Sequence, residues 1–167
     1  MDKLWAPWRI NYITNNAKEK KCLFCRVKKA RDDQKNLVVF RSKLCFVMLN
    51  LFPYNNGHLM VSPYRHISNV SDLNKEEMVD LFKAAALMEK ILTKTIKSQG
   101  YNIGINSGKV AGAGILGHLH IHLVPRWQGD TNFMPIIAET KVISQSLQEL
   151  YKILRKEIIK TKGLSLC

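Results

Sequence analysis

The stretch that organises this chain reads Gly117-His118-Leu119-His120-Ile121-His122-Leu123-Val124-Pro125-Arg126-Trp127, and its three histidines alternate with aliphatic residues. A β-strand turns successive side chains to opposite faces, so the three imidazoles should share one face and the aliphatic side chains the other. Alternate residues of a strand lie roughly 6.6 Å apart, a spacing at which a row of imidazoles can follow a phosphate chain. Pro125 lacks an N–H and should mark the end of regular ladder pairing.

Two chemical interpretations of this row compete. His-x-His can supply two zinc ligands, in which case His118 and His120 would both bind the metal. We favour nucleophilic catalysis by the central imidazole, His120, with His122 donating a hydrogen bond to a phosphate oxygen where charge accumulates. Neutral imidazole suits an attack on phosphorus, because its ordinary pKa of about 6.5 leaves it mostly unprotonated near pH 7. A backbone carbonyl should orient the other ring nitrogen of His120, and the ring should point into an open cleft.

The length and composition indicate a single domain over residues 1–167, with an N-terminal segment at 1–36 and a C-terminal helix and tail at 136–167. A chain of 167 residues with 46% hydrophobic residues can bury one core. No apolar run approaches the about 20 residues of a membrane span, and the first residues lack the apolar centre of a signal peptide. The four cysteines include Cys22-x-x-Cys25, which is typical of metal binding in a reducing compartment. We therefore expect a cytoplasmic protein.

The chain is strongly basic, with a formal net charge of +13. A basic surface attracts polyanions, and charge alone would favour a zinc-stabilised nucleic-acid binder. The lysines are scattered, however, with much of the excess at residues 18–35 and 152–162, and no basic strand interleaved with aromatic residues resembles an RNA-binding signature. We therefore do not expect nucleic acid as the partner. Two compatible interpretations of the charge remain. The lysines form a solvated surface, or their electrostatic field attracts a polyphosphate nucleotide.

The Cys-x-x-Cys pair can hold one zinc ion, but tetrahedral closure needs two more ligands. Only five histidines are present; His66 follows an expected strand end, and His118 opens the row. A site of Cys22, Cys25, His66 and His118 would be closed and structural. It would also fix the orientation of His118 beside the reacting His120. A reduced, metal-free Cys-x-x-Cys is the alternative.

The remaining pattern predicts an α+β fold, an antiparallel sheet of about five strands with two main helices. Short strands are expected at residues 37–40, 45–49, 58–62, 101–106 and 117–126. Before the long helix, Asn74 is a candidate N-cap with Glu77 three residues later, and Gly100 should end it. A second amphipathic helix is expected at 144–160. The apolar side of the long helix should comprise Met78, Leu81, Phe82, Ala85, Met88, Leu92 and Ile96.

A glycine-rich loop from Ser107 to Gly117 joins the last two expected strands. Its glycines have the G-x-G-x-x-G spacing, but a strand follows where a dinucleotide-binding turn requires a helix. Glycines still let a phosphate approach backbone N–H groups closely, so the loop is either a phosphate contact or a flexible hairpin connection. Trp127, just after the histidine row, either stacks on a second nucleoside or shields the site.

The histidine row resembles the histidine triad (HIT) family. The run AGAGILGHLHIHLVPRWQGDTNFMP at 111–135 and the segment 50–63 resemble more narrowly its bacterial diadenosine polyphosphate phosphorylase and hydrolase branch. The resemblance implies a HIT-like fold and dinucleoside polyphosphate cleavage at the α-phosphorus. A covalent nucleotidyl-histidine would form on His120, with water or inorganic phosphate as acceptor. It also implies that Asn50 holds the ribose hydroxyls and that His58, eight residues later, lines the nucleotide pocket.

The same resemblance places the glycine-rich loop beside the phosphates, with Asn106 or Ser107 near its start and Gly114 and Ile115 within it. It implies zinc on the four ligands named above, because zinc-bearing members show that ligand pattern, and a two-fold homodimer. A nucleoside phosphoramidase, as in other members, and a non-catalytic nucleotide-binding module are the alternatives. The resemblance alone does not separate hydrolysis from phosphorolysis.

Overall fold

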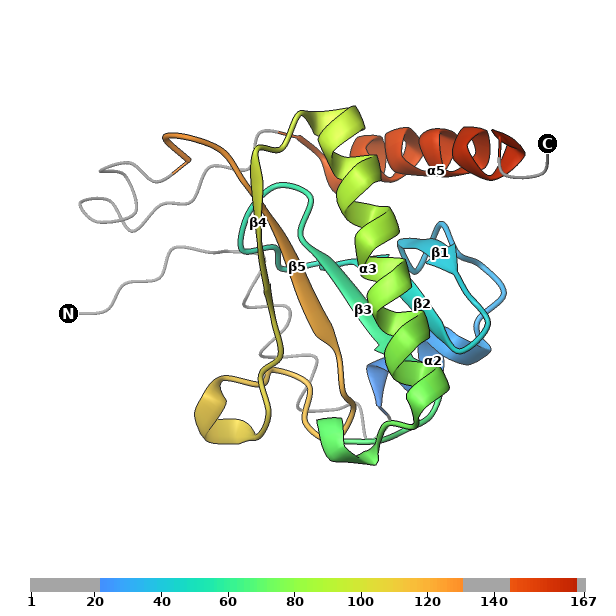
Figure 1. Ribbon diagram of the computed structural model, residues 1–167, viewed down its shortest axis with the longest axis vertical. Helices are drawn as coiled ribbons and strands as arrows, with labels where there is room; N and C mark the ends of the chain where they lie inside the picture. Colours follow the sequence, from blue (N-terminus) through green and yellow to red (C-terminus); the bar gives the residue numbers. More distant parts are fainter. Residues whose placement is uncertain (1–21, 131–144, 165–167) are drawn as a thin grey trace.

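A five-stranded antiparallel sheet forms the centre of the molecule in a computed structural model that describes residues 22–130 and 145–164, with side chains to residue 161 (Figure 1). The strand order is β1-β2-β3-β5-β4, which confirms the expected α+β fold. Four of the five strands lie within two residues of their expected limits. The strands are β1 (Val38–Arg41), β2 (Cys45–Leu49), β3 (Leu59–Pro63), β4 (Gly100–Gly104) and β5 (Ile121–Arg126).

Three α-helices accompany the sheet, α2 (Leu23–Lys29), α3 (Lys75–Ile96) and α5 (Leu147–Leu164), with two short 3-10 turns, η1 (Val70–Asp72) and η2 (Lys109–Ala111). Helix α3 crosses the sheet in Figure 1, and α5 lies across one end of it. No helix in the described part of the chain combines the length and apolarity that crossing a bilayer requires.

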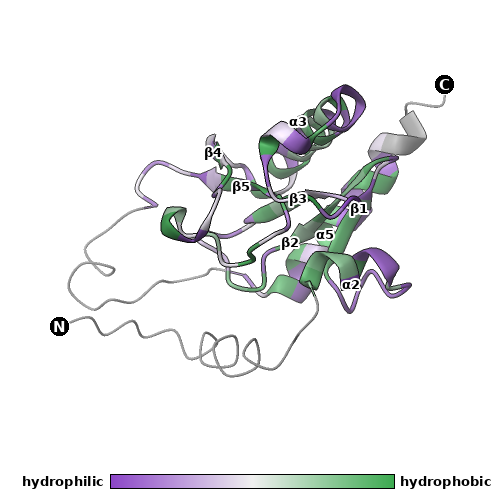
Figure 2. Ribbon diagram, turned by 90° about the horizontal axis from the view of Figure 1, so that it is seen from below, coloured by the Kyte–Doolittle hydropathy of each residue, from purple (hydrophilic) through white to green (hydrophobic). Residues whose placement is uncertain are grey.

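The two faces of the sheet bury two separate cores. Alternate residues of β2 divide between them: Val47 and Leu49 pack with α3 and α5, whereas Phe46 and Met48 pack with α2. This division follows from the two-residue period of a strand. Figure 2 shows hydrophobic colour concentrated in the strands and in α5, while α2 carries both hydrophobic and hydrophilic residues.

Helix α3 has the expected start but a different end and a rotated apolar face. The Asn74 side chain accepts a hydrogen bond from the Glu77 N–H at 2.8 Å, and the Glu77 carboxylate accepts from the Asn74 N–H at 3.1 Å. The helix ends at Ile96 and not at Gly100, and its C-cap, Lys97, has a left-handed φ of 54°. Met78 and Phe82 are exposed, so their expected burial is wrong. The buried side is formed by Glu77, Leu81, Ala84, Ala85, Met88, Ile91 and Leu92.

Strand β5 begins later than expected. Ile121 lies opposite Val61 in the antiparallel register, so an earlier start would have to pair with the end of β3 at Pro63. Proline has no N–H to donate to a ladder. The preceding segment is held by an isolated hydrogen bond instead, from the Leu119 N–H to the Ile67 carbonyl at 2.7 Å.

Helix α2 is not among the elements expected from the sequence. With seven residues it is too short to be stable by propensity alone. It is stabilised by the burial of Phe24 and Val27, which are 0% and 1% exposed. This helix places residues of the Cys-x-x-Cys segment against the sheet face that carries the histidines.

Candidate active site

The histidine row lies on the α2 face of the sheet. Ile121 and Leu123 point into the core beneath α3, so His120 and His122 occupy the opposite face, as the alternation predicted. The ring centroids of His120 and His122 are 4.7 Å apart. Regular pairing starts only at Ile121, and His118, which precedes the strand, is linked to His120 through Phe24, whose ring contacts both imidazoles.

Each ring of the row has a tautomer that its neighbours define. His120 Nδ1 lies 3.0 Å from the His118 carbonyl oxygen, and a carbonyl can only accept. Nδ1 therefore carries the proton and Nε2 keeps its lone pair, as a nucleophile requires. The expectation that a backbone carbonyl orients this ring is confirmed. Burial lowers the pKa of His120 below its ordinary value, although the hydrogen bond to His118 opposes that change.

His122 has the complementary tautomer, which is set by a hydrogen-bond relay from the turn at 50–58. His58 Nδ1 accepts from the Tyr54 N–H at 3.0 Å and from the Asn50 side-chain amide at 3.3 Å. His58 Nε2 must then carry the proton, which it donates to His122 Nδ1 at 2.9 Å. His122 Nε2 consequently carries a proton and is a donor. Burial, followed by the charge of His120, lowers the pKa of His122 to about 4.

The His120 ring is more deeply buried than we expected. His120 is 4% exposed and His122 is 8% exposed, so neither ring points into a wide open cleft. Within the described residues, the one buried side-chain nitrogen or oxygen without a hydrogen bond is an oxygen of Glu157. Neither His120 Nε2 nor His122 Nε2 has a hydrogen bond from the described residues, and neither is among the fully buried atoms that lack one. Each Nε2 therefore lies in the small exposed part of its ring.

Four sulfur and nitrogen atoms converge beside the first histidine of the row. Cys22 Sγ, Cys25 Sγ, His66 Nδ1 and His118 Nδ1 all lie within 4.8 Å of one another. Contacts of 3.2, 3.2, 3.6 and 3.2 Å join them in the pairs Cys22–His118, Cys25–His66, Cys25–His118 and His66–His118.

This geometry fits a metal ion. A tetrahedral zinc ion with two sulfur and two nitrogen ligands needs ligand separations of about 3.3–3.8 Å. His118 Nε2 donates to the Pro63 carbonyl at 3.0 Å, which leaves the lone pair of Nδ1 facing the sulfurs. The structure thus brings together the four residues that the sequence suggested. His120 is not among the residues whose ligand atoms converge within 4.8 Å in the described part of the chain, so this cluster does not support the alternative that His118 and His120 share a metal.

The residues expected to bind the nucleotide are divided between two segments. Asn50 caps the 50–58 turn through its oxygen, which accepts from the Phe52 N–H at 2.9 Å, and its amide donates to His58 as described. His58 is 0% exposed, so it lies behind His122 and not on an open pocket wall.

The glycine-rich loop is joined to the α2 face of the sheet. The Asn106 amide donates to the Gly112 carbonyl at 3.4 Å, whereas Ser107 and Gly114 are exposed. Ile115 packs against the cluster that contains Phe24. Gly117 has a φ of +78°, and a Cβ there would lie 3.9 Å from His66 Nε2, so the loop ends beside the candidate metal ligands.

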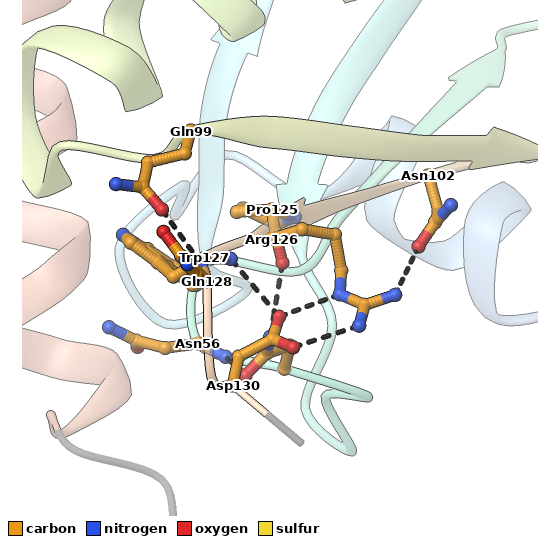
Figure 3. Close-up of polar contacts among 9 residues, drawn as sticks. Asn56, Gln99, Asn102, Pro125, Arg126, Trp127, Gln128 and Asp130 are labelled. Carbon is orange, nitrogen blue, oxygen red and sulfur yellow. Dashed lines mark hydrogen bonds and ion pairs between the residues drawn. The ribbon is translucent and has the colours of Figure 1, made fainter.

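Trp127 lies at the opposite end of β5. Its indole N–H donates to the Ile96 carbonyl at 3.2 Å, and its backbone N–H donates to Asp130 at 3.1 Å. The Asp130 carboxylate also accepts hydrogen bonds from the Arg126 guanidinium through both oxygens, at 2.6 and 2.8 Å (Figure 3). It accepts a further hydrogen bond from the Asn55 amide at 2.9 Å. This clamp fixes the 50–58 turn to the end of β5, and the structure does not bring Trp127 into contact with the three imidazoles.

Two aromatic residues that sequence reasoning missed bracket the histidine row. Phe24 contacts His118 and His120, with centroid distances of 5.1 and 5.0 Å. Tyr54, at the other end, stacks on His122 at 5.4 Å and 25°. Their signals were faint: Phe24 stands between the two cysteines, and Tyr54 stands in a turn four residues before His58.

Comparison with known proteins agrees with this geometry. The family model of the HIT domain matches residues 31–129, and the chain belongs to the HIT family. An AP-4-A phosphorylase from Mycobacterium tuberculosis is 38% identical over 165 residues, which cover 94% of this chain and 84% of that protein. A bis(5'-adenosyl)-triphosphatase from Dictyostelium discoideum is 36% identical over 93 residues, 56% of this chain and 62% of that protein.

Solved structures share the fold. A Zn-bound histidine triad family protein from Mycobacterium smegmatis superposes with a TM-score of 0.71 at 21% identity, covering 86% of this chain and 97% of that one. A hypothetical histidine triad nucleotide-binding protein from Sulfolobus tokodaii gives a TM-score of 0.68 at 26% identity, covering 84% and 94%.

Proposed function

We propose that this protein is a nucleotide hydrolase or phosphorylase that cleaves dinucleoside polyphosphates, of the diadenosine type, through a covalent nucleotidyl-histidine. One observation carries the proposal. The lone pair at His120 Nε2 and the proton at His122 Nε2 are presented side by side, in tautomers that the surrounding hydrogen bonds define. A nucleophile beside a hydrogen-bond donor is what transfer at a phosphorus centre requires.

In the first step, His120 Nε2 attacks the α-phosphorus, and the bond between that phosphorus and the bridging oxygen breaks. The electron pair leaves with the nucleoside polyphosphate, and His122 Nε2–H donates to the phosphate oxygen on which charge accumulates. In the second step, water or inorganic phosphate attacks the phosphorus and the bond to His120 breaks. When water is the acceptor, its proton passes to solvent.

The choice of acceptor is tested by product analysis. Relatives include one named a phosphorylase and another named a triphosphatase, so both acceptors belong to the proposal. Diadenosine tetraphosphate should give ADP and ATP when phosphate is the acceptor, and AMP and ATP when water is. Purified protein with and without phosphate separates these products, and a labelled nucleotidyl-enzyme should be trapped when the acceptor is limiting. Nucleotide binding without turnover or label would instead indicate a non-catalytic module.

The surrounding residues receive supporting roles. We assign contacts with the ribose to Asn50 and contacts with the phosphates to the loop that contains Asn106, Ser107, Gly114 and Ile115. His58 acts through His122, because its buried ring sets the tautomer of that donor. Trp127 is the candidate contact for a distal second nucleoside, since it lies beyond the other end of β5.

The Cys22, Cys25, His66 and His118 site is proposed to bind one zinc ion. The support is the convergence of two sulfurs and two lone-pair nitrogens at tetrahedral separations. All four positions are protein ligands, so the ion would be structural. When bound, it would hold His118, whose carbonyl orients the nucleophile. Metal analysis of protein purified without chelator should give one zinc per chain.

A homodimer of single-domain chains is also proposed. Strand β4 is at the edge of the sheet, and such an edge can pair with another chain. Ile103 on β4 and Phe82 on α3 are 46% and 62% exposed, which offers apolar surface for a second copy. Sedimentation should give twice the chain mass, and Ile103→Lys should give the monomer. Cys22, Cys25 and Cys45 are not joined by disulfides, which supports the expected cytoplasmic location.

A further inference from the structure

Phe24 lies between the candidate metal site and the candidate nucleophile. In the sequence it stands between the two cysteines, and in the structure its ring contacts both His118 and His120 at about equal centroid distances, 5.1 and 5.0 Å. It is 0% exposed. Phe24 thus contacts the row from a segment in which Cys22, the N-cap of α2, and Cys25 place their sulfurs 3.2 and 3.6 Å from His118 Nδ1.

We infer that Phe24 is a positioning residue that couples metal occupancy to the placement of the His120 ring, so that the enzyme's turnover responds to zinc although zinc does not touch the substrate. The inference rests on the proposed function. It concerns regulation of that site and assigns no chemical step to the metal.

The coupling has a physical basis in the small size of α2. Seven residues do not hold a helix in place by propensity, so the position of α2 depends on its anchors. These are the burial of Phe24 and Val27 on one side and the ligation of Cys22 and Cys25 on the other. Interiors are close-packed, so a shift of the helix after metal loss must move the Phe24 ring against its neighbours.

His120 is sensitive to such a shift because little else fixes the nucleophilic end of its ring. Its Nδ1 is held by the His118 carbonyl, and the flanking rings of Phe24 and His122 fix the ring plane. Metal loss would remove the anchor at His118 Nδ1, although Nε2 stays on the Pro63 carbonyl, and would free Phe24 to shift at the same time. Misplacing a reacting atom by about 1 Å can cost about a hundredfold in rate.

Phe46 provides a matched control. It is 0% exposed and belongs to the same core cluster, and it contacts Phe24 at 6.2 Å and stacks on Tyr64 at 5.6 Å. No ring contact joins it to a histidine within the described residues. Phe24→Leu and Phe46→Leu therefore remove similar buried volume from one cluster, but only the first removes a ring that touches the row.

The experiment measures kcat for the wild type and both variants, each with zinc and after chelator treatment. Zinc removal should lower the wild-type kcat about tenfold to a hundredfold. Phe24→Leu should already be slow with zinc bound, by about tenfold, and should lose much less on metal removal, because coupled effects are not additive. Phe46→Leu should respond to zinc removal like the wild type. Equal responses of all three proteins, or loss of the response in Phe46→Leu as well, would overturn the inference.

A second measurement does not depend on turnover. Long-range nitrogen–proton spectra of the imidazoles report the tautomer and order of His120. In the wild type, the signal of an Nδ1-protonated His120 should be sharp with zinc and lost without it, whereas in Phe24→Leu it should be broad in both states while the zinc content stays at one per chain. A His120 signal unchanged by zinc in the wild type contradicts the coupling even if catalysis proceeds as proposed. Absence of any nucleotidyl-enzyme, with the spectral response intact, contradicts the proposed function alone.

Discussion

The two ends of the histidine row are held by different means. At the His118 end, two thiols and a second imidazole surround Nδ1, which is a geometry suited to a metal. At the His122 end, a chain of hydrogen bonds runs from the Tyr54 N–H through His58 to His122 Nδ1. The strand period alone places three equivalent rings on one face, so the differences between their roles arise from their neighbours.

The contrast explains why the central ring can be a nucleophile. His118 directs its lone pair at the cysteines, and His122 directs its lone pair at His58. His120 instead donates its Nδ1–H to the backbone carbonyl of His118, and its lone pair, at Nε2, has no hydrogen-bond partner among the described residues. A carbonyl anchor cannot titrate, so the free lone pair of His120 does not depend on the protonation of a partner.

Loss of the central ring should have the largest effect. His120→Ala should reduce turnover by about four orders of magnitude or more, since nucleophiles that act as part of a unit show losses of that size. Zinc content and the circular dichroism spectrum should be retained, because neither end of the row is altered. The measurement is kcat on diadenosine tetraphosphate together with a search for labelled enzyme. Covalent labelling of His120→Ala would contradict the assignment of the nucleophile.

Loss of the hydrogen bond from His58 to His122 should have the second largest effect. His58→Phe cannot donate to His122 Nδ1, so the tautomer of the donor is no longer defined, and kcat should fall about a hundredfold, as for loss of one preorganised donor. His58→Gln keeps an N–H at a similar reach and should restore part of that loss. Both variants should keep full zinc content, which separates this end from the other. Equal rates for the two variants would mean that His58 acts only by packing.

Sequence reasoning recovered what depends on periodicity and on counting. The alternation around Ile121 predicted that His120 and His122 share a face. Because the chain has only five histidines, few candidates could complete a metal site with Cys22 and Cys25. It could not recover contacts that arise when distant segments pack. The ring of Phe24 meets His120 only because a helix forms at 23–29, and His58 meets His122 only because β3 and β5 pair.

The errors have the same origin. Met78 and Phe82 fit a helical period, but so do Glu77 and Leu81, one position earlier. The helix packs against the sheet with Glu77 and Leu81 buried and with Met78 and Phe82 exposed. Strand β5 started late because its partner ends at Pro63, a constraint that belongs to the neighbouring strand. Local patterns therefore predicted most of the helices and strands. The buried face of α3 and the start of β5 depend on neighbouring elements, and only the structure shows them.

Metal removal should weaken the His118 end and leave the His58 end intact. A ligand present at a hundredfold excess over its dissociation constant stabilises a protein by about 2.7 kcal/mol, so chelator should lower the free energy of unfolding by an amount of that order. Cys25→Ser should lose the metal and become insensitive to chelator. Urea denaturation with and without chelator measures both effects, with His58→Phe as the control that should respond like the wild type. A wild-type stability that does not change with chelator would contradict a structural zinc.

The pH dependence of stability also distinguishes the two ends of the row. Burial and the neighbouring His120 lower the pKa of His122 to about 4, against an ordinary value of about 6.5 in the unfolded chain. Between these pH values the unfolded chain binds a proton at His122 that the folded chain excludes. The stability that this group contributes is therefore complete above pH 6.5 and is lost as the pH falls toward 4, by no more than about 1.4 kcal/mol per pH unit. Urea denaturation of the wild type and of His122→Gln from pH 4.5 to 7 should give curves that converge as the pH falls. Curves that stay parallel would mean that burial does not keep the His122 ring neutral. The row would then lack the electrostatic difference between its His122 end and its His118 end.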